Sequence, residues 1–198
     1  MKRLILPLLM TLCAAPVAAN DPADPLWPCI QRRQPALSVG AMWTGPAPDA
    51  ATEARARAPE IAGLAEGLAL RRMPLPEAEA RIAAFAETAP PADLTALFLA
   101  VFTRIDSHRS RVIEGIDRYA KGQTDLAARI EATRAEMARL EAATPPDFDA
   151  IDKLETQLEW DSRIFDERRA SLSAVCESPV ILEQRAFALG RAMAGHLP

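Results

Sequence analysis

The feature that most constrains this chain is a run of 47 residues, from Leu94 to Leu140, that contains no proline. Only Gly115 and Gly122 are weak helix formers within it, so intrinsic propensity favours a single helix. At 1.5 Å per residue, that helix would be about 70 Å long. A compact domain of this chain length has a radius of gyration of about 16 Å. We therefore expect the helix either to break near Gly122 or to project from a smaller body.

Mostly apolar residues recur along this run at alternating steps of three and four, which is the heptad pattern of a coiled coil. We call the helix face that they form, which is expected to pack against a second helix, the seam. The seam has one stutter, from His108 through Val112 to Ile116. Its members are Phe98, Val101, Ile105, His108, Val112, Ile116, Tyr119, Gln123, Leu126, Ile130, Thr133, Met137 and Leu140. A second series with the same spacing follows Pro145-Pro146 and comprises Ile151, Leu154, Leu158, Asp161, Phe165, Arg168, Leu172 and Val175.

Two long helices joined by a short Pro-Pro turn are expected to fold back as an antiparallel hairpin. Asp147 has the residue type of an N-cap for the second helix. A turn centred on residue 145 sets the register of the two helices. It pairs Leu140 with Ile151, Met137 with Leu154, Ile130 with Asp161, Leu126 with Phe165 and Gln123 with Arg168. The hairpin arm then covers residues 117–176, and Cys176 returns to the level of Gly115.

The other helices are predicted to be short and to build a small body. Pro59 and Pro76 suit the first turn of two helices, which end near Arg71-Arg72 and before Pro90-Pro91. Ser178 and Pro179 predict the start of a separate final helix. The expected fold is all-α, with a small helical body and a long antiparallel two-helix coiled-coil hairpin in one domain, 49–198.

The N-terminus predicts a signal peptide over residues 1–19, cleaved after Ala19. Lys2 and Arg3 precede an apolar run from Leu4 to Leu12, and Val17-Ala18-Ala19 supplies the small residues of a cleavage site. The run is too short to span a bilayer, and no later segment is apolar enough, so we expect a periplasmic or secreted protein with no integral membrane segment. Residues 20–48 are proline-rich and predict an extended strap, held against the helices by Trp27 and Trp43.

Export changes the interpretation of the cysteines. Cys13 leaves with the signal peptide, so the mature chain keeps Cys29 and Cys176. In an oxidising compartment these two thiols have one intramolecular pairing, and we predict a disulfide between them. A redox-active or metal-binding thiol is the alternative, but neither cysteine lies in a C-x-x-C motif or beside a histidine.

Composition excludes several classes of function. A formal net charge of -4 gives no electrostatic footprint for nucleic acid. No nucleophile, phosphate-binding or metal motif is present, so we expect neither an enzyme nor a bound cofactor.

His108 is interpreted as a histidine near the helix interface. Asp161 and Arg168 are polar residues on the seam, where such residues fix register and partner choice at a cost in stability.

We therefore expect a scaffold or adaptor that binds another protein through the arm or the groove at its base. The candidate partner contacts are Asp161, Arg168, Gln123 and His108. Arg168 is expected to hydrogen-bond Gln123, whereas Asp161 must reach Arg129, Arg134 or a group on another chain. The alternative function is a helical bundle that binds a small ligand or metal ion between helices near His108 and Asp161.

Overall fold

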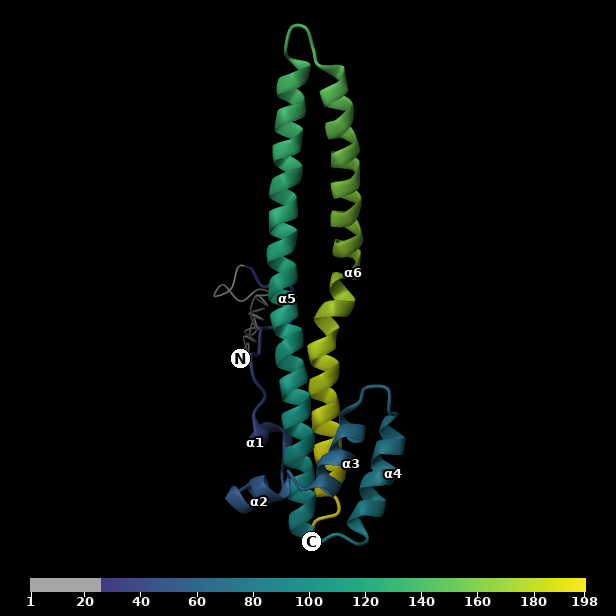
Figure 1. The fold of residues 1–198 in the computed structure, drawn as a ribbon. Helices are drawn as coiled ribbons and strands as arrows, with labels where there is room; N and C mark the ends of the chain where they lie inside the picture. Colours follow the sequence, from purple (N-terminus) through teal and green to yellow (C-terminus); the bar gives the residue numbers. More distant parts are fainter. Residues whose placement is uncertain (1–25) are drawn as a thin grey trace, which may run out of the picture.

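The computed structural model describes residues 26–198, and over that range it contains helices and no strand. Its helices are α1 (Val39–Met42), α2 (Ala50–Arg55), α3 (Pro59–Ala69), α4 (Leu75–Ala86), α5 (Pro91–Glu141) and α6 (Phe148–Ala194). Figure 1 shows α5 and α6 as a long antiparallel hairpin, with the short helices gathered at one end. The predicted all-α hairpin fold is confirmed. The predicted signal peptide and its cleavage site lie outside the described residues.

Helix α5 runs through Gly122 without a break, so the predicted helix projects beyond the body (Figure 1). Its 51 residues correspond to about 76 Å. Pro91 occupies the first turn, where its missing N–H costs no helical hydrogen bond. At the other end of the hairpin, the Asp147 side chain accepts a hydrogen bond from the backbone N–H of Ala150 and caps α6 as predicted.

Helix α6 differs from the prediction, because no separate helix begins at Ser178. The helix continues through Pro179, and the Ser178 hydroxyl donates to the Ala174 carbonyl one turn earlier. An internal proline removes one backbone donor and crowds the carbonyl four residues before it. The proline is buried, and packing along α5 holds the helix together across this defect. Figure 1 shows α6 bending where the arm meets the body, which is the usual response to such a residue.

The main core lies in the body and joins the strap to both long helices. Trp43 stacks on Phe98 of α5, with ring centroids 4.4 Å apart, and its indole N–H donates to the Pro46 carbonyl at 2.8 Å. A Cβ atom added at Gly190 of α6 would lie 2.4 Å from the Met42 carbonyl oxygen. Glycine is therefore needed at position 190 so that the strap can approach α6 closely. The strap is also less extended than predicted, since α1 forms one helical turn within it.

A buried arginine, which the sequence analysis did not single out, ties α6 to the end of α3. Arg185 donates from Nε and Nη2 to the Leu68 carbonyl at 2.8 and 2.6 Å, and from Nη1 to the Met73 carbonyl at 2.9 Å. The Leu68 carbonyl lies in the last turn of α3, where no helical donor is available. Burial lowers the pKa of the Arg185 guanidinium. The side chain thus satisfies backbone acceptors that would otherwise be buried without partners.

Candidate functional site

The seam carboxylate of the arm has a partner within the chain. Asp161 is buried, and Arg129 of α5 donates to it from Nε at 2.8 Å and from Nη2 at 3.0 Å. This two-point contact is the geometry in which guanidinium and carboxylate bind most strongly. The Arg129 guanidinium holds the pKa of Asp161 below its ordinary value. The sequence left Arg129, Arg134 and a group on another chain as possible partners of Asp161, and the structure shows that Arg129 binds it. The carboxylate of Asp161 is therefore not unpaired on the seam.

The predicted hydrogen bond between Arg168 and Gln123 is wrong, although the helices meet within about one turn of the predicted register. Gln123 Nε2 donates to the Phe165 carbonyl at 3.3 Å, and its Oε1 has no hydrogen-bond partner among the described residues. The Tyr119 hydroxyl donates to the backbone carbonyl of Arg168. Burial raises the pKa of Tyr119. The Arg168 side chain is exposed rather than on the seam, and it lies beside Gly122.

The position of His108 on the seam is also wrong. His108 is exposed, and the adjacent Arg109 is buried in its place. The two successive four-residue steps begin at Ile105 rather than at His108, so the buried face shifts to Arg109 and Ile113. A heptad pattern tolerates either reading, and the aliphatic part of an arginine can pack on a helix interface.

Arg109 holds the strap and α6 together on one side of α5. Its Nη1 donates to the Gln34 carbonyl at 2.6 Å, and its Nη2 lies 3.6 Å from Glu183 Oε2. One helical turn earlier in α5, Asp106 Oδ1 accepts a hydrogen bond from the backbone N–H of Leu37 at 2.9 Å. These contacts form a structural junction between the strap and the two long helices.

His108 and Asp161 do not form a single ligand site. Asp161 lies beside Arg129, and the 21 residues of continuous helix from His108 to Arg129 span about 32 Å. Within residues 26–198, no group of three or more His, Cys, Asp or Glu side chains could hold a metal ion. The site near both residues that the sequence suggested for a small ligand or metal is therefore not assembled.

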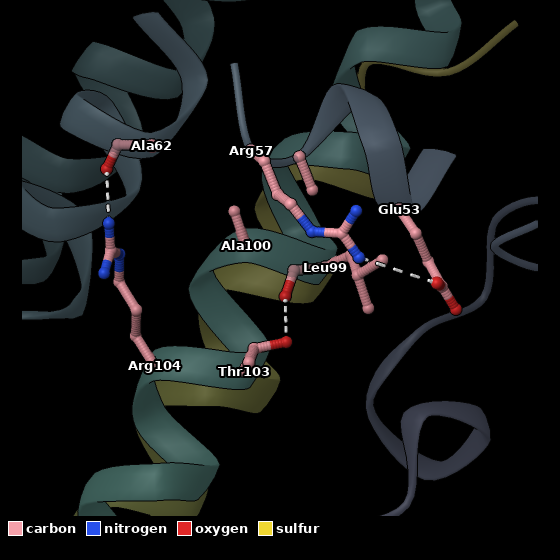
Figure 2. Close-up of a pocket in the computed structure, with 8 residues that line it drawn as sticks. Glu53, Arg57, Ala62, Leu99, Ala100, Thr103 and Arg104 are labelled. Atoms are coloured by element: carbon pink, nitrogen blue, oxygen red, sulfur yellow. Dashed lines mark hydrogen bonds and ion pairs between the residues drawn. The ribbon is translucent and has the colours of Figure 1, made fainter. Parts of the chain in front are cut away.

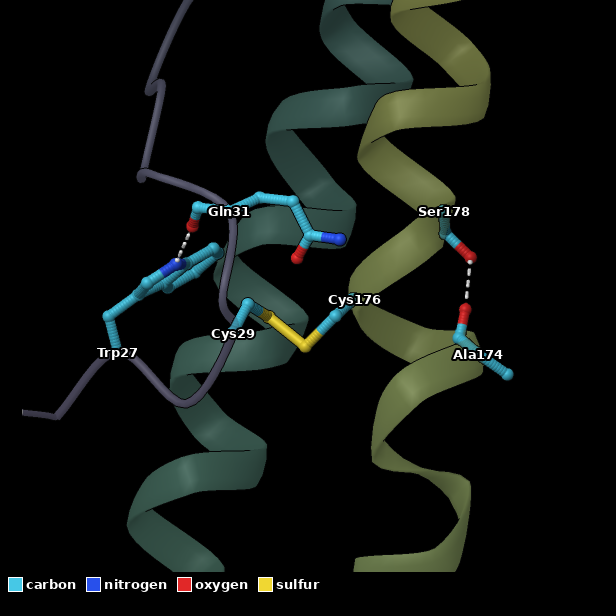
Figure 3. The surroundings of a disulfide bond; sticks show 6 residues. All are labelled: Trp27, Cys29, Gln31, Ala174, Cys176 and Ser178. Carbon is cyan, nitrogen blue, oxygen red and sulfur yellow. Dashed lines mark hydrogen bonds between the residues drawn. A yellow bond between two sulfur atoms is a disulfide. The ribbon is translucent and has the colours of Figure 1, made fainter. Parts of the chain in front are cut away.

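The base of the arm is held by the predicted disulfide. Cys29 and Cys176 are bonded, and the two half-cystines pack against Ile116 of α5. Figure 3 shows the strap passing beside α5, with the bridge reaching across to α6. The indole N–H of Trp27 donates to the Gln31 carbonyl at 2.7 Å, which closes the strap into a loop around the bridge. The predicted pairing is confirmed, and the position of Cys176 near residue 115 is as expected.

Two large apolar side chains are exposed on the arm. Phe148, at the start of α6, and Trp160, three turns later, have exposed fractions of 69% and 58%. The Arg163 guanidinium lies 4.0 Å from the Trp160 ring centroid. Elsewhere on the arm the larger apolar residues are buried or half-buried between the helices. These two side chains therefore stand out as large apolar surface outside the interface between the helices, although Arg163 covers part of the Trp160 ring.

A hollow of about 490 Å³ lies on the body, between α2, α3 and α5. Figure 2 shows Leu99, Ala100 and Thr103 of α5 along it, with Arg57 extending toward Glu53 and Arg104 toward Ala62 on the opposite side. Arg104 Nη2 donates to the Ala62 carbonyl of α3 at 3.0 Å. Sequence patterns could not locate this hollow, because its residues come from three helices and the loop between two of them.

Comparison with known proteins identified no relative: no family model, no curated protein and no solved structure matches this chain. Within residues 26–198, no helix combines the length and apolarity that crossing a bilayer requires.

Proposed function

We propose that this protein is an exported helical adaptor that binds another protein through its hairpin arm. The observation that carries the proposal is the pair of exposed aromatic side chains on the arm, Phe148 and Trp160. Aromatic residues are enriched at the energetic centres of protein interfaces. Figure 1 shows α1 to α4 gathered at the body, so these short helices leave the flanks of the arm open.

The charge of the arm supports a protein partner rather than a lipid surface or nucleic acid. From Asp147 to Glu159 the sequence has five acidic residues and one basic residue, Lys153. Anionic lipid and phosphate backbones would be repelled by such a segment. An amphipathic helix or a groove on a partner could take up the aromatic side chains and complement the carboxylates.

Two features support export. The N-terminal sequence has the order of a signal peptide, and a disulfide persists in an oxidising compartment. Mass spectrometry of the exported fraction should find a mature chain that begins at Asn20. An intact Met1 would contradict this part of the proposal.

The adaptor function is tested by capture from the exported fraction with full-length protein. The double variant Phe148→Ser/Trp160→Ser should fold normally, because both side chains are exposed, but should lose the captured partner. The control is Ile30→Ser on the strap, which removes a side chain with an exposed fraction of 83%. If both variants capture the same proteins as the wild type, the arm is not the binding surface.

A further inference from the structure

We propose that the hollow between α2, α3 and α5 binds an amphiphile with a single carboxylate, such as a medium-chain fatty acid. This site lies in the body and is separate from the arm, so it does not depend on the adaptor function. The hollow has an apolar floor, and charged side chains surround it (Figure 2).

The floor of the hollow suits an alkyl chain. It is lined by Leu99 and Ala100 of α5, Ala62 of α3 and Ala56 of the segment before α3. Small side chains on three sides leave the open volume of about 490 Å³, which lies within the range of small-molecule sites. An alkyl chain in this hollow would cover apolar surface that now faces water.

The guanidinium of Arg57 makes only a long ion pair, with Glu53, and can turn to bind a head group. Its side chain has an exposed fraction of 75%, and its Nη2 lies 3.9 Å from Glu53 Oε2. That separation is longer than a hydrogen bond, so the donors of Arg57 are not committed to Glu53. A ligand carboxylate at the mouth of the hollow could accept two of these N–H groups at once.

Arg104 supplies a second, more fixed guanidinium. Its bond to the Ala62 carbonyl uses Nη2 and leaves Nη1 and Nε without a partner among the described residues. The Thr103 hydroxyl donates to the Leu99 carbonyl at 2.8 Å, so its proton is not available to the ligand. Recognition of the head group would therefore fall to the arginines.

The balance of charge selects a monoanion. The charged residues that line the hollow are Arg57, Arg104 and Glu53, which together carry one net positive charge. One carboxylate neutralises that charge and can pair with a guanidinium, whereas a cationic head group would be repelled and an uncharged one would gain no ion pair. The apolar floor and the single excess charge together define a fatty acid rather than a polar anion.

The first test is calorimetric titration of the full mature chain with decanoate, below the concentration at which it forms micelles. Decanoate should bind at one site, and decanol and decyltrimethylammonium should bind at least tenfold more weakly. Shortening the acid to octanoate and hexanoate should weaken binding by about two- to fourfold for each methylene removed. Failure of decanoate to bind, or equal binding of decanol, would overturn the proposal.

The second test places the ligand with matched variants. Thr103 and Thr124 are both threonines of α5 whose hydroxyls donate to the carbonyl four residues earlier, but only Thr103 lines the hollow. Thr103→Trp should fill the hollow and abolish binding, whereas Thr124→Trp should change the affinity less than twofold. Arg57→Gln should weaken decanoate at least fivefold without changing the melting temperature. Unaltered binding to Thr103→Trp would show that decanoate binds elsewhere and would refute the assignment.

Discussion

Removal of the disulfide should cost this protein a large part of its stability while leaving the folded structure in place. The perturbation is the double variant Cys29→Ala/Cys176→Ala. The bridge closes a loop with a sequence separation of 147 residues. In the chain-entropy description, closing a loop of that length stabilises the folded state by about 5 kcal/mol. For a domain of this size, that corresponds to a fall in melting temperature of about 10–20 °C.

The folded strap should remain docked without the bridge, because other contacts hold it. Arg109 binds the Gln34 carbonyl, the Leu37 amide binds Asp106, and Trp43 stacks on Phe98. Native-state hydrogen exchange should therefore still protect the amide of Leu37 in the double variant.

Guanidinium denaturation of the wild type and the double variant, each with and without reductant, measures the effect of the bridge. Reductant should lower the stability of the wild type to that of the variant and should leave the variant unchanged, which serves as the control. A loss of less than about 1 kcal/mol would refute the loop-entropy argument. Loss of protection at Leu37 would show instead that the bridge is needed to hold the strap in place.

Two further predictions concern the arm and the body. Asp161→Asn should lower stability near neutral pH, and the difference from the wild type should shrink as pH falls from about 6 to about 2. Arg129 lowers the pKa of Asp161 in the folded state, so this ion pair stabilises the fold fully above the unfolded-state pKa of about 3.9 and loses its effect as pH falls through the folded-state pKa. Urea denaturation at a series of pH values measures the difference in unfolding free energy between wild type and variant, and a difference that does not change with pH would contradict this reasoning. Gly190→Ala should cost about 1–3 kcal/mol because the new Cβ meets the Met42 carbonyl. Gly63→Ala, with no atom within 4 Å of its Cβ, should stabilise α3 by about 0.5–1 kcal/mol, and thermal denaturation of the two variants should show opposite signs.

The hairpin, its register and its disulfide could be predicted because each depends on a pattern that repeats or on a single pairing. Seam residues at three-four spacing continue over many turns, so one wrongly assigned position does not change the predicted extent of the helix. The Pro145-Pro146 turn then fixes which residues face each other, and the Arg129–Asp161 pair lies at the level expected for residue 130.

The heptad pattern could not predict that Arg109 rather than His108 lies on the buried face of α5. Both residues are polar, and the stutter admits either of them on the buried face. The structure buries Arg109 because the Gln34 carbonyl and Glu183 meet its guanidinium there, and both belong to segments distant in sequence. The same limit applies to Pro179, where packing against α5 and the body outweighs a local signal that usually starts a helix.

The contacts of the strap also determine when each part of the chain can fold. The amide of Leu37 binds a carboxylate 69 residues further along, and the carbonyl of Gln34 binds a guanidinium 75 residues further along. Met42 packs against Gly190, which lies near the end of α6. Contacts between residues so far apart form only after both partners have been synthesised, and each has to overcome the entropy of closing the long intervening loop. The strap therefore cannot reach its final place before α6 has been synthesised, although it lies near the start of the mature chain, and Trp43 cannot stack on Phe98 before α5 exists.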